Sequence, residues 1–181
     1  MQLSLNNQLV RFVVTGSLLY IGWLLLYEFY LHPHTGFDAV IIRSLVVSTE
    51  VVLQTAGYSL SDYNNIPHAA QQHVGIEGSG GLTVGAPCDG VVLYVLFICF
   101  IAAFPGPLKH KAWYLPLGTL SVFAVNVLRI ASLAVIVYVN PEWLAFNHDY
   151  TFTLLVYSYV FALWMLWVKK FSTLGERVNA G

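Results

Sequence analysis

The stretch AWYLPLGTLSVFAVNVLRIASLAVIVYV, residues 112–139, contains one charged side chain, Arg129, and consists mainly of apolar residues. A run of about 20 predominantly apolar residues can cross a lipid bilayer as a helix. The whole chain has the same character, since its 181 residues are 57% hydrophobic and 9% charged and its mean hydropathy is +0.69. Soluble domains carry about 25% charged residues. The sequence therefore predicts an integral membrane protein.

Similar apolar segments recur along the chain and predict an all-α fold, a polytopic bundle of about five transmembrane helices in a single domain, residues 1–181. The expected spans are residues 12–31, 39–58, 90–104, 112–139 and 150–168.

The basic residues predict how this bundle is oriented, because Lys and Arg near span ends gather on the cytoplasmic side. Two lysines lie between the third and fourth spans, and three basic residues follow the fifth: Lys109, Lys111, Lys169, Lys170 and Arg177. The opposite ends of these spans are expected to face outward. Five spans place the N-terminus outside as well, where Arg11 is an exception to the rule.

A polar loop, residues 59–87, precedes the third expected span and is predicted to face outward. Its segments 73–77 and 82–84 flank a glycine-rich turn and predict a short hairpin. The loop ends at Pro87, so Cys88 is expected to begin the third span. A helix N-terminus favours a thiolate, whereas apolar burial opposes one, and the sequence leaves this balance open.

Three reactive side chains belong to three successive spans: Cys88 and His148 fall at their outward ends, and Arg129 lies inside the fourth span, residues 112–139. Together they could perform acyl transfer, with a thiol as nucleophile, a guanidinium to bind an oxyanion and an imidazole as acid and base. Each also has a structural interpretation. Cys88 could be a small apolar residue, Arg129 could pair with Glu50, and His148 could be a hydrogen-bonded edge residue.

The sequence shows no pattern typical of a metal site, a nucleic-acid-binding surface or a disulfide framework. The histidines show no metal-ligand spacing, so neither a metal site nor a cofactor is expected. A net charge of −1 argues against nucleic-acid binding. Cys88 and Cys99, if they lie on one helix, would be about 16 Å apart, too far for a disulfide.

Three motifs nevertheless resemble those of a known family. The segments APCDG (86–90), NVLRI (126–130) and NHD (147–149) resemble, in order and placement on successive helices, the exosortase/archaeosortase family. The resemblance covers about residues 80–171. Family members are membrane-embedded transpeptidases that process C-terminal sorting tails of exported proteins.

The resemblance implies that Cys88 is the nucleophile and that Arg129 and His148 complete the catalytic site. Asn126 corresponds to the family's asparagine before the arginine, and Asp149 is a possible support for His148. Asp89 is a departure, because family members often have Ser or Thr after the cysteine. A carboxylate there opposes thiolate formation unless Arg129 or His148 offsets its charge.

The expected function is therefore a cysteine transpeptidase or protease in a prokaryotic plasma membrane, with its site facing outward. Its partners would be membrane lipid and exported clients that carry a C-terminal sorting signal and a transmembrane tail. One alternative is a noncatalytic membrane subunit that binds a partner helix through Arg129, Glu50 and Asn126. A small transporter is a further alternative, which the lack of an internal repeat disfavours.

Overall fold

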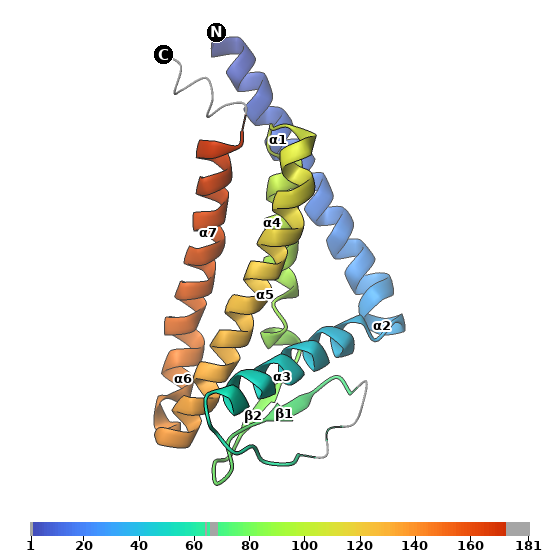
Figure 1. Cartoon of the computed structure of the whole chain (residues 1–181). Helices are drawn as coiled ribbons and strands as arrows, with labels where there is room; N and C mark the ends of the chain where they lie inside the picture. The colour runs from blue at the N-terminus through green and yellow to red at the C-terminus, as the bar shows by residue number, and fades with distance from the viewer. Residues whose placement is uncertain (1, 64, 66–68, 173–181) are drawn as a thin grey trace.

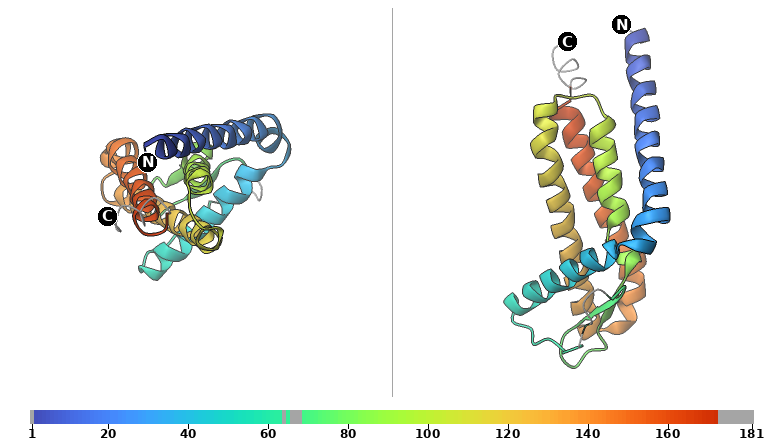
Figure 2. Two further views of the ribbon diagram at one scale, coloured as in Figure 1. Left: turned by 90° about the horizontal axis from the view of Figure 1, so that it is seen from above. Right: turned by 90° about the vertical axis from the view of Figure 1, so that its right-hand side faces the viewer.

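The computed structural model describes residues 2–63, 65 and 69–172, and the prediction of a mostly helical chain is confirmed, with 77% helix. Four helices run along the length of the molecule: α1 (Gln2–Leu26), α4 (Val91–Ala103), α5 (Leu108–Val139) and α7 (Phe152–Lys170). A fifth helix, α3 (Phe37–Thr55), lies across one end of this bundle (Figures 1 and 2). We call this the site end, and we call the end where α1 begins and α7 ends the opposite end.

Short elements connect these helices at the site end. The π-helical turn η1 (Tyr27–Leu31) and α2 (His32–His34) extend α1 towards α3. After α5 the chain turns through η3 (Pro141–Trp143), α6 (Leu144–Phe146) and a second π-helical turn, η4 (Asn147–Thr151), before α7. Isolated π-helical turns within helices are frequent at functional sites.

Three of these helical stretches are long and apolar enough to cross a membrane, namely residues 7–34, 108–139 and 141–170. They contain the first, fourth and fifth expected spans. The third expected span corresponds to α4, which is strongly apolar but has 13 residues. At about 1.5 Å per residue, α4 alone is shorter than the hydrocarbon core of a bilayer.

The second expected span, residues 39–58, is not among these membrane-crossing stretches. Its helix α3 carries Asp38, Arg43 and Glu50 within 19 residues. One face of α3 is buried against α5 and β1, including Ile42, Leu45 and Leu53, while Val40 and Val47 are exposed. The exposed side combines these valines with Arg43 and Ser44, so α3 is only partly amphipathic, and its buried apolar stripe holds it across the bundle end.

The loop before α4 forms a two-stranded antiparallel hairpin at the site end. Strand β1 (Gln72–Val74) pairs with β2 (Leu82–Val84), and His73 lies opposite Thr83. These strands fall largely within the two stretches expected to be extended. Residues 64 and 66–68 of the same loop lie outside the described residues.

Two apolar clusters hold the molecule together. The first joins α3, the hairpin and the second half of α5, around Ile42, Val74 and Ile130. The second joins α4, α5 and α7, around Phe97 and Trp167, both of which are fully buried. The first cluster fixes the hairpin against α5, next to the segment that carries Cys88.

Candidate active site

Cys88 lies in a tight turn between the hairpin and α4, rather than in the first turn of the helix as the sequence predicts. It ends the 3-10 turn η2 (Ala86–Cys88), where its backbone N–H donates to the carbonyl of Gly85 at 2.8 Å. Helix α4 begins at Val91 because Asp89 Oδ1 accepts the Val91 N–H at 2.8 Å. The first N–H of α4 is therefore bound by the Asp89 carboxylate, and those of Leu93 and Tyr94 donate to the carbonyl of Gly90.

His148 is in contact with Cys88, although 60 residues separate them in the chain. Its Nε2 lies 3.4 Å from Cys88 Sγ, and its Nδ1 lies 2.8 Å from Asp149 Oδ1. A carboxylate can only accept a hydrogen bond, so Nδ1 carries the proton in the neutral ring and Nε2 is left free to accept one. The π-helical turn η4 presents this histidine at the start of the last long helix.

Asn126 holds the turn that carries Cys88 in place. Its side chain is fully buried on α5, and its Nδ2 donates to the carbonyl of Cys88 at 3.0 Å. Gly90 makes this approach possible, because its φ of +77° favours glycine and a Cβ there would lie 3.1 Å from Asn126 Nδ2. Asn126 therefore positions the nucleophile's backbone.

Arg129 follows Asn126 by one helical turn and is partly buried. Its charge lowers the pKa of the Cys88 thiol, so the guanidinium lies within electrostatic range of the sulfur. No ion pair or hydrogen bond of Arg129 is found among the described residues, Glu50 included. Burial raises the pKa of the Glu50 carboxyl, and the positive charge of Arg43 partly counters this rise.

The alternative cluster of Arg129, Glu50 and Asn126 is thus not assembled in the described part of the chain. Asn126 bonds to the Cys88 turn, and Glu50 is on α3 near Arg43. Within the described residues Arg129 has neither an ion pair nor a hydrogen bond, and it acts on the thiol through its charge. A guanidinium without such a partner is suited to bind an anion.

Burial raises the pKa of the Cys88 thiol above its ordinary value, and Asp89 adds to the rise. Arg129 and the backbone at Gly85 act in the opposite direction and only partly offset it. The balance that the sequence leaves open is therefore decided by burial. Cys88 is a neutral thiol at rest, so it needs a base, and His148 is in contact with it.

Asp89 is 3% exposed, and its Oδ2 has no hydrogen-bond partner within the described residues. Burial raises its pKa from 3.8 to about 6, and the charge of Asp38 adds to the rise, while the Val91 N–H and His32 lower it. The carboxyl is thus neutral over part of the physiological range, which weakens its opposition to a thiolate at Cys88.

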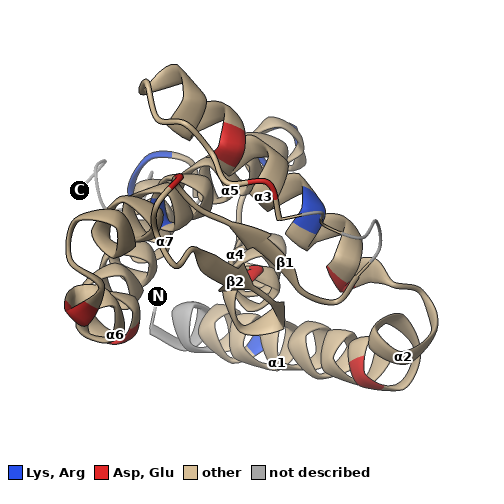
Figure 3. Ribbon diagram, turned by 90° about the horizontal axis from the view of Figure 1, so that it is seen from below, with Lys and Arg blue, Asp and Glu red and all other residues tan. Residues whose placement is uncertain are grey.

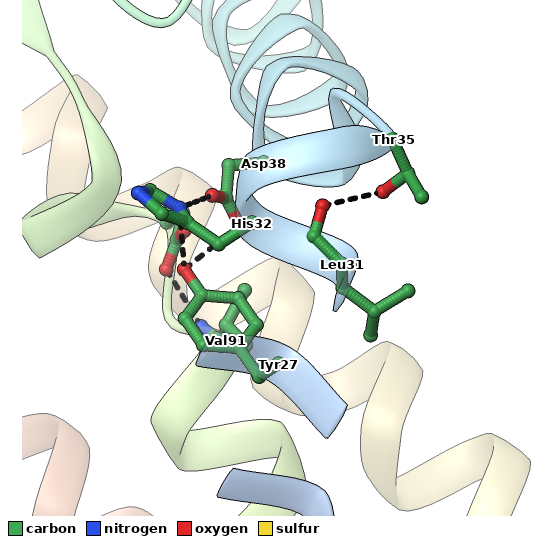
Figure 4. A network of polar contacts seen from close by, with 7 residues as sticks. Tyr27, Leu31, His32, Thr35, Asp38 and Val91 are labelled. Atoms are coloured by element: carbon green, nitrogen blue, oxygen red, sulfur yellow. Dashed lines mark hydrogen bonds and ion pairs between the residues drawn. The ribbon is translucent and has the colours of Figure 1, made fainter. Parts of the chain in front are cut away.

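A polar network beside Asp89 was not anticipated from the sequence. Tyr27 Oη donates to Asp38 at 3.0 Å, and His32 Nδ1 lies 2.6 Å from the other oxygen of Asp38. Figure 4 shows Tyr27 and His32 both pointing to this carboxylate. No motif could have linked these residues to Cys88, because the corner between α1 and α3 meets the turn before α4 only in the folded chain.

A cavity of about 610 Å³ opens beside Cys88 and His148. It is bordered by β2, by Ile130 and Leu133 of α5 and by the turn from Pro141 to Ala145. Ligand sites commonly combine apolar walls with a few convergent polar groups, and this cavity has that composition.

All eight acidic side chains of the described residues belong to elements at the site end, as the view in Figure 3 from that side illustrates. No group of three or more His, Cys, Asp or Glu that could hold a metal ion occurs in the part of the chain that the structure describes.

Comparisons with protein-family models, with curated proteins and with solved structures give no match. The resemblance to exosortases therefore rests on the three motifs themselves.

Proposed function

We propose that this protein is a membrane-embedded cysteine transpeptidase or protease that cleaves C-terminal tails of exported proteins. The observation that carries the proposal is the distance of 3.4 Å between Cys88 Sγ and His148 Nε2. A neutral thiol beside the unprotonated nitrogen of an oriented imidazole is the arrangement required for base-assisted nucleophilic attack.

In the proposed reaction, His148 Nε2 takes the thiol proton as Cys88 sulfur attacks the scissile carbonyl carbon. The tetrahedral oxyanion forms near Arg129, whose unpaired guanidinium stabilises it. The C–N bond then breaks, the departing amine takes the proton from His148, and a thioester remains on Cys88. An incoming amine, or water in a protease, gives its proton to His148 and attacks the thioester carbonyl. The C–S bond then breaks, and His148 returns the proton to the sulfur, which restores the Cys88 thiol.

The charge distribution supports a site that faces away from the cytoplasm. The first turn of α5 and the last turn of α7 lie at the opposite end and carry Lys109, Lys111, Lys169 and Lys170. Helix α1 starts at the opposite end and runs towards the site end, where α3 lies. Arg11, in the first half of α1, therefore also belongs to the opposite end. Arg11 is then on the same side as the four lysines, so it no longer departs from the positive-inside rule as it does in a five-span topology. The rule puts the opposite end in the cytoplasm.

This orientation suits a client that is anchored by its own apolar tail in a prokaryotic plasma membrane. Such a client presents the bond just outside its tail at the height of Cys88. Confinement to the membrane raises the effective concentration of the bond at the site.

The proposal is tested in the native host with a tagged chain that is wild-type, Cys88→Ala or Cys99→Ala. Exported proteins that keep their C-terminal tails only in the Cys88→Ala strain are the expected clients, and mass spectrometry of the wild-type chain should detect a client fragment as a hydroxylamine-labile adduct on Cys88. The Cys99→Ala strain is the matched control. Normal processing in the Cys88→Ala strain would refute the enzyme and favour a binding subunit.

A further inference from the structure

Strand β2 has one edge that pairs with no other strand. Within the described residues the sheet contains β1 and β2 alone, so β2 has a strand neighbour only on the β1 side. The other side of the hairpin is occupied, because Asn65 bonds to His73 of β1 and, just beyond β1, Ser61 N–H donates to Gly75 O and Glu77 N–H donates to Ser59 O. The hairpin therefore has a single open edge, which belongs to β2.

The hydrogen bonds of His73 show which backbone groups occupy this open edge. In an antiparallel pair, hydrogen-bonded and non-hydrogen-bonded residue pairs alternate. The N–H and C=O of His73 bond to the side chain of Asn65, each at 2.7 Å, and so face away from β2. The pair of His73 and Thr83 is therefore the non-hydrogen-bonded one, and both backbone groups of Thr83 face outward from the sheet.

This edge borders the same cavity as the thiol and the imidazole. Four successive residues, 81–84, line the cavity together with Cys88 and His148. Successive side chains of a strand point to opposite faces, so an unbroken run of lining residues adjoins the cavity through its backbone edge. The outward N–H and C=O of Thr83, which bond to no other backbone group within the described residues, thus lie along the cavity that contains Cys88.

We infer that the polypeptide client binds as an extended strand along the open edge of β2, with hydrogen bonds to the N–H and C=O of Thr83. Strand addition provides affinity through main-chain groups, while pockets for alternate side chains provide specificity. The apolar wall formed by Ile130 and Leu133 is suited to one such side chain. This inference rests on the proposed function, and it names the substrate as an extended main chain rather than a helix.

The test uses the full chain in lipid nanodiscs and a mixed pool of acetyl-tripeptide chloromethyl ketones, which alkylate a reactive cysteine. Chloroacetone carries the same reactive group without a peptide, so its rate with Cys88 reports the reactivity of the thiol without any contribution from peptide binding. The variant Thr83→Pro removes the outward N–H and no bond to β1, whereas the control Thr83→Ala keeps the N–H and removes the side chain that contacts His73 Nδ1 at 3.1 Å. The pool is also prepared with N-methylated amides, which tests the same hydrogen bonds on the unaltered protein.

Thr83→Pro is expected to slow alkylation of Cys88 by the peptide pool about ten-fold, as the loss of one or two backbone hydrogen bonds predicts. N-methylation should have a similar effect, while Thr83→Ala and the rates with chloroacetone should stay within about two-fold of wild type. If peptide and N-methylated pools react equally fast with a Cys88 that chloroacetone labels readily, strand addition is refuted and the proposed function stands. A Cys88 that is inert to chloroacetone would refute the proposed function itself.

Discussion

Two cavities of similar size are each lined by a cysteine, and they differ in the side chains that surround the sulfur. Cys99 lies in a cavity of about 730 Å³ between α1 and α4, bordered mainly by apolar side chains such as Leu18, Trp23 and Ile98. Cys88 lies in the smaller cavity, of about 610 Å³, where an imidazole is in contact with the sulfur. Volume is thus a poor guide to function in this molecule, whereas the convergence of polar groups distinguishes the second cavity.

The comparison is tested most strongly by the two thiols themselves. Chloroacetone at neutral pH should alkylate Cys88 at least 100-fold faster than Cys99, because among the described residues a base contacts Cys88 and none contacts Cys99. Mass spectrometry of chymotryptic peptides over time measures both rates in one sample, because cleavage after Tyr94 or Phe97 separates the two cysteines. Equal rates would mean that the two cavities are chemically alike.

Removing the imidazole of His148 should bring the alkylation rate of Cys88 close to that of Cys99. In His148→Ala we expect alkylation of Cys88 to slow by about 100-fold, within the range that a general base contributes. Asp149→Asn should have a much smaller effect, since Asp149 is exposed and its role is to orient the ring. A wild-type rate in His148→Ala would remove the histidine from the mechanism.

Substitutions of Arg129 should separate the effect of its charge on the Cys88 thiol from the effect of its hydrogen-bond geometry on client processing. Because its charge lowers the pKa of the Cys88 thiol, Arg129→Gln should shift the pH profile of Cys88 alkylation to higher pH, and Arg129→Lys should leave the profile nearly unchanged. Client processing should fall about ten-fold or more in both variants, since an ammonium lacks the planar donor pair of a guanidinium. Arg43→Gln, which alters the other arginine of the site end, is the control and should change neither measurement.

Asp89 should produce the smallest effect, seen as a pH-dependent change in stability. Its pKa is raised from 3.8 to about 6, so the folded state prefers the protonated carboxyl. The stability that this preference adds is fully present below about pH 4 and is lost as the pH rises through 6, with a total of about 2–3 kcal/mol. Asp89→Asn should melt at nearly constant temperature between pH 4 and 7, whereas the wild-type chain should lose stability over that interval. Parallel melting curves for the two proteins would contradict the assigned pKa.

The apolar segments of the chain differ in how far their structure could be predicted. The spans at 112–139 and 150–168 could be located from composition because a membrane-crossing helix needs a long apolar run. The segment at 39–58 has a similar apolar content, but Arg43 and Glu50 interrupt it, and the buried stripe of α3 packs on α5 and the hairpin instead. Apolar content alone does not distinguish an amphipathic helix at the end of a bundle from a span.

The candidate site shows the same division. The residue types at 88, 129 and 148 and their place on successive helices were apparent from the sequence. The position of Cys88 outside α4, the network of Tyr27, His32 and Asp38, and the open edge of β2 were not, because each depends on contacts between segments far apart in the chain.

The sequence by itself determined a mostly helical chain with apolar membrane-length segments and the chemical groups that those segments carry, since both follow from local composition. Only the tertiary structure decided that an imidazole contacts one of the two thiols and that Asn126 fixes its backbone. The physical reason is that the reactivity of a cysteine depends on burial, charge and hydrogen bonds within a few ångströms, and these are set by how helices pack.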